Sequence, residues 1–167
     1  MLHVQKRTLI NEIKKVFRSH PEADWWLSFP GTTGPLTPAR LLAWIGDDRS
    51  RFPNAGTLQA VAGTVPITRR SGKSKTVEFR RNCSHPLRNA ADDLARQSMR
   101  HSGWARAYFQ QQLKQGHSAA RAYRALANRW MKIIWTLWQR RELYDEAKHV
   151  ANRSRKGLTA QTLAEAV

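Results

Sequence analysis

The chain has 167 residues and carries 29 Lys and Arg against 12 Asp and Glu, which gives a formal net charge of +17 at pH 7. Hydrophobic residues make up 41% of the chain, enough for one core, and the length suits one compact domain or a small domain with an arm. The one cysteine, Cys83, excludes an intramolecular disulfide framework. No stretch approaches the roughly 20 apolar residues of a membrane span, so we expect a cytoplasmic protein with no membrane segment and no signal peptide.

The excess positive charge indicates a polyanionic partner, nucleic acid first, because each phosphate neutralised by Lys or Arg releases condensed counterions. The charge is not confined to a tail: between Arg69 and Arg88, seven cationic residues stand against one acid, Glu78. A solvated basic face is the alternative. An anionic membrane is a weaker candidate, since the basic stretch carries no continuous apolar helical face.

Apolar residues recur at helical spacing over residues 2–19 and predict an amphipathic helix that a proline ends. A short helix follows over 22–29 and leads into a turn rich in glycine and proline. The next helix is expected to begin near Thr37, whose hydroxyl would cap it, and to end at Ile45.

A further short helix is predicted over 54–62, with Asn54 as its cap. The segment 64–84 changes in character, because its β-branched residues, glycine and charge density indicate an extended or hairpin-like structure. Helical periodicity then returns and predicts helices over 86–101, 103–115 and 118–140, the last capped by Ser118.

The chain after residue 150 is predicted to be a basic polar tail, 151–167, with a linker over 152–157 and a weak final helix. The fold class expected from these elements is mainly α. It combines a helix-hairpin-helix element and a C-terminal helical bundle, with an irregular basic loop or hairpin region between them. Residues 1–20 are expected to form a coiled-coil-like helix and 21–150 the main domain.

The two helices within 22–46 and the turn between them follow the helix-hairpin-helix pattern. Gly31 and Gly34 would let the backbone approach a phosphate, and N–H groups at the start of the second helix would bind it without reading a base. The usual pattern spaces its glycines as G-x-G, and this turn is one residue longer. An ordinary corner between two helices is the alternative.

The basic loop contains a serine beside a glycine, Ser71-Gly72. The following Lys73 and Ser74 invite comparison with a nucleotide-binding P-loop, but that loop needs a glycine where this chain has Ile67. A serine hydroxyl that attacks a phosphodiester would need nearby cations to hold the phosphate. The candidates for contact with nucleic acid are Arg69, Arg70, Lys73, Lys75, Arg80, Arg81 and Arg88. A phosphate-binding or merely solvated serine is the alternative.

Aromatic residues follow the C-terminal half at the spacing of packed helices, which favours a helical core over a base-stacking platform. They are Trp104, Tyr108, Phe109, Tyr123, Trp130, Trp135 and Trp138. Cys83 is expected to be a small packing residue. Because the histidines are scattered and the acidic residues occur as adjacent pairs, we expect no metal site in this chain.

Several stretches, in this order along the chain, resemble the C-terminal domain of the bacterial insertion-sequence transposases of the IS110 and IS116 group. Together they cover roughly residues 20–148. They are Phe29-Pro30-Gly31, Arg51-Phe52-Pro53, Leu58-Gln59-Ala60, Ser71-Gly72-Lys73-Ser74, Pro86-Leu87-Arg88, Ser102-Gly103-Trp104-Ala105-Arg106-Ala107-Tyr108, Arg124-Ala125-Leu126-Ala127-Asn128-Arg129-Trp130 and Tyr144-Asp145.

The resemblance implies a domain of a DNA transposase or recombinase in which Ser71 is the nucleophile for strand exchange. In this family a RuvC-like domain binds magnesium through four acidic residues, so this chain itself is expected to bind no cofactor. The resemblance further implies DNA and a structured guide RNA as partners, a homo-oligomer in the full-length protein, the acidic domain supplied in cis or in trans, and association with the nucleoid. Because that domain is not in this sequence, we expect a fragment or truncated reading frame that is inactive alone.

Two other functions remain open from the residues alone. One is a non-catalytic helix-hairpin-helix module, or a transposase remnant, that only binds the nucleic-acid backbone. The other is a basic structural protein that binds RNA. Chemistry at Ser71 distinguishes the first of these from the transposase, because both would bind nucleic acid in a salt-dependent way.

Overall fold

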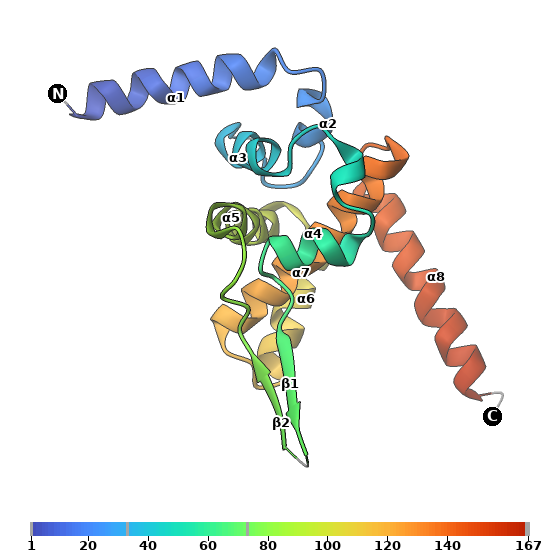
Figure 1. Ribbon diagram of the computed structural model, residues 1–167. Helices are drawn as coiled ribbons and strands as arrows, with labels where there is room; N and C mark the ends of the chain where they lie inside the picture. Colours follow the sequence, from blue (N-terminus) through green and yellow to red (C-terminus); the bar gives the residue numbers. More distant parts are fainter. Residues whose placement is uncertain (1, 33, 73, 166–167) are drawn as a thin grey trace.

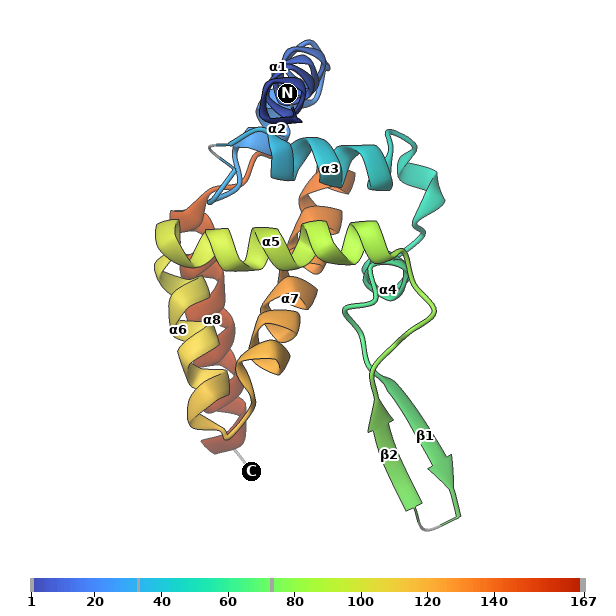
Figure 2. The same cartoon turned by 90° about the vertical axis from the view of Figure 1, so that its left-hand side faces the viewer.

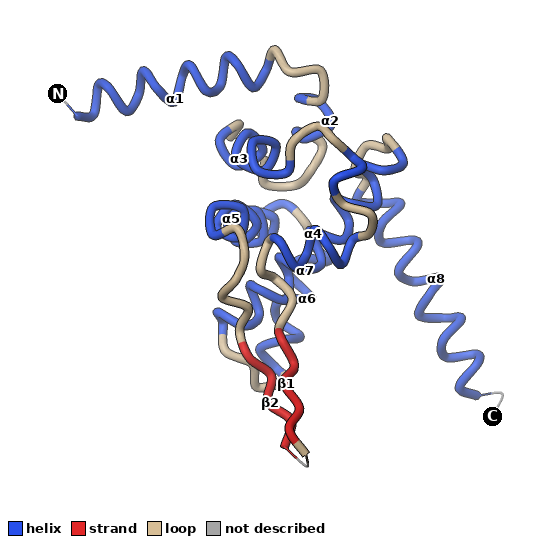
Figure 3. Tube along the Cα trace, in the orientation of Figure 1, coloured by secondary structure: helices blue, strands red, loops and turns tan. Residues whose placement is uncertain are grey.

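The described chain is predominantly helical, with one two-stranded antiparallel sheet (Figure 3), which confirms the mainly α fold class. A computed structural model describes residues 2–32, 34–72 and 74–165. Side chains are described in these ranges except at Leu2, Arg69, Ser74, Lys75 and 156–165.

Three helices form the N-terminal part: α1 (Leu2–Arg18), α2 (Ala23–Leu27) and α3 (Leu36–Ile45). The first of them extends away from the body of the molecule (Figure 1). Its last turn joins the core through the buried Phe17, whereas Val4 and Val16 are exposed. The helix expected over 2–19 is therefore confirmed, and it projects as an arm.

The middle of the chain forms a short 3-10 helix, η1 (Arg49–Arg51), then α4 (Ala55–Val61) and a hairpin of β1 (Ile67–Ser71) and β2 (Ser74–Glu78). The Asn54 side chain accepts a hydrogen bond from the Thr57 N–H at 2.9 Å and confirms the predicted cap. The two strands pair directly with each other, and Figure 2 shows them projecting from the helical body.

Four helices complete the chain: α5 (His85–His101), α6 (Gly103–Lys114), α7 (Ala119–Arg140) and α8 (Glu146–Glu165). The Ser118 hydroxyl accepts from the Arg121 N–H at 3.3 Å, so the predicted cap of α7 is confirmed. Helix α5 contacts both α3 and α7 and lies between them at the centre of the molecule (Figure 2).

The core is built around fully buried tryptophans. Trp26, Trp130 and Trp138 are each 0% exposed. The indole N–H of Trp130 donates to the Ser98 hydroxyl at 2.8 Å, which satisfies that polar group inside the core. The aromatic residues of the C-terminal half therefore serve mainly as helical core, as the sequence predicted.

Two local predictions are wrong. The Thr37 hydroxyl does not cap α3, which begins at Leu36 after Pro35; Thr37 is buried and accepts a hydrogen bond from the Gln97 side chain at 3.1 Å. The linker expected over 152–157 is helical, because α8 is continuous from Glu146. Its first turn is capped by Asp145, whose carboxylate accepts from the Lys148 N–H at 3.1 Å, and no proline interrupts it.

Candidate nucleic-acid interface

Ser71 is the last residue of β1 and is exposed at the far end of the projecting hairpin (Figure 2). The register pairs Ser71 with Ser74 and Arg70 with Lys75. Arg70 is also exposed, but successive residues of a strand point to opposite faces, so Arg70 and Ser71 do not share a face. Lys73 and the side chains of Arg69 and Lys75 lie outside the described part of the chain.

The root of the hairpin is fixed to the helical body by Phe79. Two guanidinium groups lie over its ring, that of Arg88 on α5 at 4.9 Å and that of Arg124 on α7 at 4.2 Å from the ring centre. Arg88 also contacts the His85 ring nitrogen Nδ1 at 2.8 Å and the Cys83 sulfur at 3.7 Å. Arg88 therefore has a structural role at this root, beside the nucleic-acid contact predicted for it.

The remaining predicted cations of this segment differ in exposure. Arg81 is exposed, whereas Arg80 is partly buried and its Nε atom has no hydrogen-bond partner within the described part of the chain.

Nearby on α5, burial raises the pKa of Asp92, although Arg124, Arg96 and Arg88 oppose that shift. Cys83 packs against Gly63, so the packing role predicted for this cysteine agrees with its position.

The two glycines of the α2–α3 turn lie in different environments. Gly31 is buried with a φ of +85°, and a Cβ atom built on it would lie 2.7 Å from the backbone carbon of Gln97 on α5. Gly34 is exposed, and an added Cβ would meet nothing within 4 Å. The turn lies at the other end of the molecule from the hairpin tip (Figure 2), so the structure does not bring the glycines together with Ser71.

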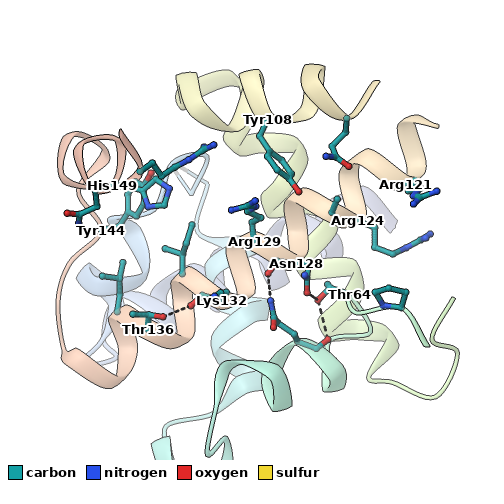
Figure 4. A pocket seen from close by; sticks show the side chains of 18 of the residues that line it. Thr64, Tyr108, Arg121, Arg124, Asn128, Arg129, Lys132, Thr136, Tyr144 and His149 are labelled. Carbon is teal, nitrogen blue, oxygen red and sulfur yellow. Dashed lines mark hydrogen bonds between the residues drawn. The ribbon is translucent and has the colours of Figure 1, made fainter. Parts of the chain in front are cut away.

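A large groove runs along one face of α7 and has a volume of about 1440 Å³. Its walls come from the hairpin root, from Tyr108 on α6, and from Lys148 to Arg153 on α8. Figure 4 shows Tyr108, Arg121, Arg124 and Arg129 around the same hollow. The Asn128 side chain accepts a hydrogen bond from the Thr64 hydroxyl at 2.9 Å and fixes the floor to the loop after α4.

The groove carries more positive than negative charge. Its cationic lining residues are Arg121, Arg124, Arg129, Lys132, Arg140, Lys148 and Arg153. Its acidic ones are Glu78 at the hairpin root and Glu142 and Asp145 in the α7–α8 loop. Among the described side chains, ion pairs between Arg40 and Asp93, Arg49 and Glu22, and His20 and Asp47 lie outside the groove.

A hydrogen-bonded cluster lies where Tyr144 and His149 line the groove. The Tyr144 hydroxyl donates to Glu146 at 2.6 Å and accepts from the Trp104 indole at 2.8 Å. Burial raises the pKa of Tyr144 above its ordinary value, and the hydrogen bond to Glu146 adds to the shift. Burial lowers the pKa of His149, which packs with its ring centroid 4.6 Å from that of Trp104.

Sequence reasoning missed this groove because it assigned α7 to the core alone. The helix has a second face: its cations Arg121, Arg124 and Lys132 recur on the side opposite the buried Trp130 and Ile134. That separation of charged and apolar residues is visible in the sequence. The walls of the groove are not, because they come from segments distant along the chain.

Metal ligands do not gather anywhere among the described residues: no group of three or more His, Cys, Asp or Glu side chains there could hold an ion. None of the described helices is sufficiently long and apolar to span a bilayer.

Comparison with known proteins places these features in a family. A sequence model of the family described as Transposase IS116/IS110/IS902 matches residues 26–110. The chain is similar to a mini-circle IS117 protein of Streptomyces coelicolor, named for a transposase, at 38% identity over 143 residues; the match covers 86% of this chain and 34% of that protein.

Two further relatives come from insertion elements. The IS900 42 kDa protein of Mycobacterium paratuberculosis is 31% identical over 83% of this chain and 35% of its own length. The IS110 43.6 kDa protein of Streptomyces coelicolor is 30% identical over 86% of this chain and 35% of its own length. The chain thus spans about a third of the length of these curated relatives. With its family model matching more than half of the sequence, the chain belongs to the Transposase IS116/IS110/IS902 family.

Proposed function

We propose that this chain is the serine-bearing, DNA-contacting domain of a DNA transposase and that Ser71 is its nucleophile. The observation that carries the proposal is the exposed position of Ser71 at the tip of a hairpin, in a chain of net charge +17 that belongs to a transposase family. An exposed, projecting hydroxyl is accessible to a phosphodiester that could not enter the packed core.

The proposed step is a transesterification. The Ser71 oxygen forms a bond to the phosphorus of a DNA phosphodiester, and the bond from that phosphorus to one sugar oxygen breaks. The proton that the serine loses is balanced by the proton that the released sugar hydroxyl gains, so the step needs no oxidant or reductant. Arg70 points to the opposite face of the strand, so other cations, from this chain or from the partner domain, would offset the charge that develops on the phosphate.

The partners belong to the same proposal. We propose that a RuvC-like acidic domain, in cis or in trans, supplies the magnesium-dependent chemistry, and that the full-length protein acts as a homo-oligomer on DNA with a structured guide RNA. Gly31 is a weaker candidate for backbone contact than the hairpin, because it is buried against α5, whereas the exposed Gly34 stays a candidate.

A covalent-adduct assay tests the nucleophile. The chain would be mixed with the acidic domain of a full-length relative and end-labelled DNA, and protein-linked label would be measured on a denaturing gel. We expect an adduct with the wild type and none with Ser71→Ala, because that variant lacks the hydroxyl oxygen that would form the bond to phosphorus.

Ser74→Ala is the matched control, since Ser74 pairs with Ser71 in the register of the same hairpin. It should keep the adduct at wild-type yield. An adduct that persists at full yield in Ser71→Ala removes the catalytic assignment. DNA binding without any adduct in the wild type supports the non-catalytic alternative instead.

A further inference from the structure

The outward face of α7 forms the floor of the open groove. Arg121, Arg124, Arg129 and Lys132 line the groove over three turns of the helix, and its acidic residues lie only at the two ends. From Arg121 to Lys132 the helix rises by about 16 Å, at about 1.5 Å per residue. That length is sufficient for several successive phosphates of one nucleic-acid strand to contact the row of cations.

Two of these arginines are held against aromatic rings. The guanidinium of Arg129 lies 4.7 Å from the ring centre of Tyr108, and that of Arg124 lies 4.2 Å from that of Phe79. Planar guanidinium and aromatic surfaces are the platforms on which unpaired bases stack. Because Arg88 and Arg124 both lie over the Phe79 ring, the stacking surfaces that the groove offers are the guanidinium planes and Tyr108.

Apolar side chains extend the groove beyond the cations. Ile133 and Leu137 are partly buried and line the same face of α7. A duplex presents phosphates outside and hides the faces of its bases, so it would use only the cations. A strand with unpaired bases would use the cations, the stacking planes and the apolar floor together.

We propose that the α7 groove is a binding site for an unpaired nucleic-acid strand. The site is distinct from the hairpin tip, since the four steps of β2 from Ser74 to Glu78 span about 13 Å at about 3.3 Å per residue. The proposal does not depend on Ser71 acting as a nucleophile. The shared ligand chemistry is a phosphodiester chain with accessible bases, which single-stranded DNA and unpaired RNA both supply.

The test measures the binding of fluorescently labelled oligo-dT and oligo-rU to the whole chain by anisotropy, at several salt concentrations. Oligomers of about 12 nucleotides are longer than the row of cations and lie within the range of about 4–16 nucleotides that small binding domains cover. The charge-reversed variant is Arg121→Glu with Lys132→Glu, since both side chains are exposed on α7 and lie outside the core.

We expect this double variant to weaken binding at low salt by at least about 30-fold. The slope of log affinity against log salt should fall by about 0.7 for each phosphate of a single strand that the variant no longer neutralises. The matched control is Lys6→Glu with Arg7→Glu on the exposed face of α1, which makes the same change in net charge. It should keep the affinity within about threefold of the wild type and preserve more of the slope than the groove variant.

Tyr108→Leu tests the stacking contribution, because it keeps an apolar side chain and removes the ring. It should weaken single-strand binding by about tenfold. Circular dichroism and thermal unfolding check that each variant keeps its fold. Comparison of the dT and rU oligomers shows whether the groove prefers single-stranded DNA or unpaired RNA.

If the charge-reversed variant binds the oligomers with wild-type affinity, the proposed binding site is wrong. Tighter binding of a blunt duplex, unaffected by Tyr108→Leu, overturns the unpaired-strand assignment. Binding of a polyglutamate peptide as tight as that of an oligomer of equal charge would indicate an acidic protein partner and also overturn it. Oligomer binding involves no chemistry at Ser71, so a failed adduct assay with intact oligomer binding removes only the nucleophile, and a groove variant with wild-type oligomer affinity removes only the groove.

Discussion

Gly31 and Gly34 stand three residues apart in one turn, and their surroundings assign them different roles. Gly31 combines a left-handed φ of +85° with a backbone approach to Gln97 that leaves no room for a side chain. Either constraint alone selects glycine. The sequence suggested that this glycine lets the backbone approach a phosphate. In the structure it lets the turn approach the backbone of α5 instead. At the residue scale, a glycine requirement identifies a close contact but not the partner.

Gly31→Ala should therefore destabilise the fold. The left-handed conformation alone costs a non-glycine residue about 1–3 kcal/mol, and the new Cβ would also force the turn and α5 apart. Gly34→Ala, the control in the same turn, should change the free energy of unfolding by no more than about 0.5 kcal/mol, because its added Cβ meets open space. Urea unfolding followed by circular dichroism measures both. Equal stability of the two variants would contradict the packing role.

Single elements were predictable where local rules determine them. The caps at Asn54 and Ser118 rest on a side chain that reaches its own helix three residues on, so the sequence contains all the information. Thr37 follows the same local pattern, but it is buried against α5, where the Gln97 side chain donates a hydrogen bond to its hydroxyl. A tertiary contact thus overrides a local preference, which no window of sequence displays.

Helix α8 is attached to the body by hydrogen bonds and ring contacts near its first turn. Glu146 accepts hydrogen bonds from the hydroxyls of Tyr144 at 2.6 Å and of Ser102 at 2.8 Å, which tie the first turn of α8 to α6. His149 lies one turn further on and packs against Trp104. Burial lowers the pKa of His149 and Arg153 lowers it further, whereas Glu146 opposes the shift.

The stability of the protein should therefore fall as the pH decreases below about 6.5, the ordinary pKa of histidine. In that range the unfolded chain binds a proton at His149 before the folded chain does, so acid favours unfolding; above it the contribution is fully present. His149→Gln should reduce the slope of the unfolding free energy between pH 5 and 7. His101→Gln, at an exposed position on α5, should keep the wild-type slope. An unchanged slope in His149→Gln would contradict the assignment.

At the scale of the whole molecule, a small helical core carries three projections: α1, the hairpin and α8 (Figure 1). The groove exists because α8 and the hairpin root stand on either side of the outward face of α7. Composition predicted a polyanionic partner, and periodicity predicted most of the helices. Neither could place Tyr108, Thr64 and Arg153 around α7, because these residues come from segments that only the tertiary fold brings together.

The net charge of +17 should also limit the stability of the free protein, because like charges repel in the folded state more than in the expanded one. Raising the salt concentration from about 10 mM to about 150 mM shortens the Debye length from about 30 Å to about 8 Å and screens this repulsion. We expect the Tm to rise by at least about 2 °C, which corresponds to about 1 kcal/mol for a domain of this size. Differential scanning fluorimetry measures it. Lys6→Glu with Arg7→Glu lowers the net charge by four and should show a smaller rise. A Tm that falls or stays constant with salt would mean that the cations are already balanced within the fold, which would argue against an open cationic groove on α7.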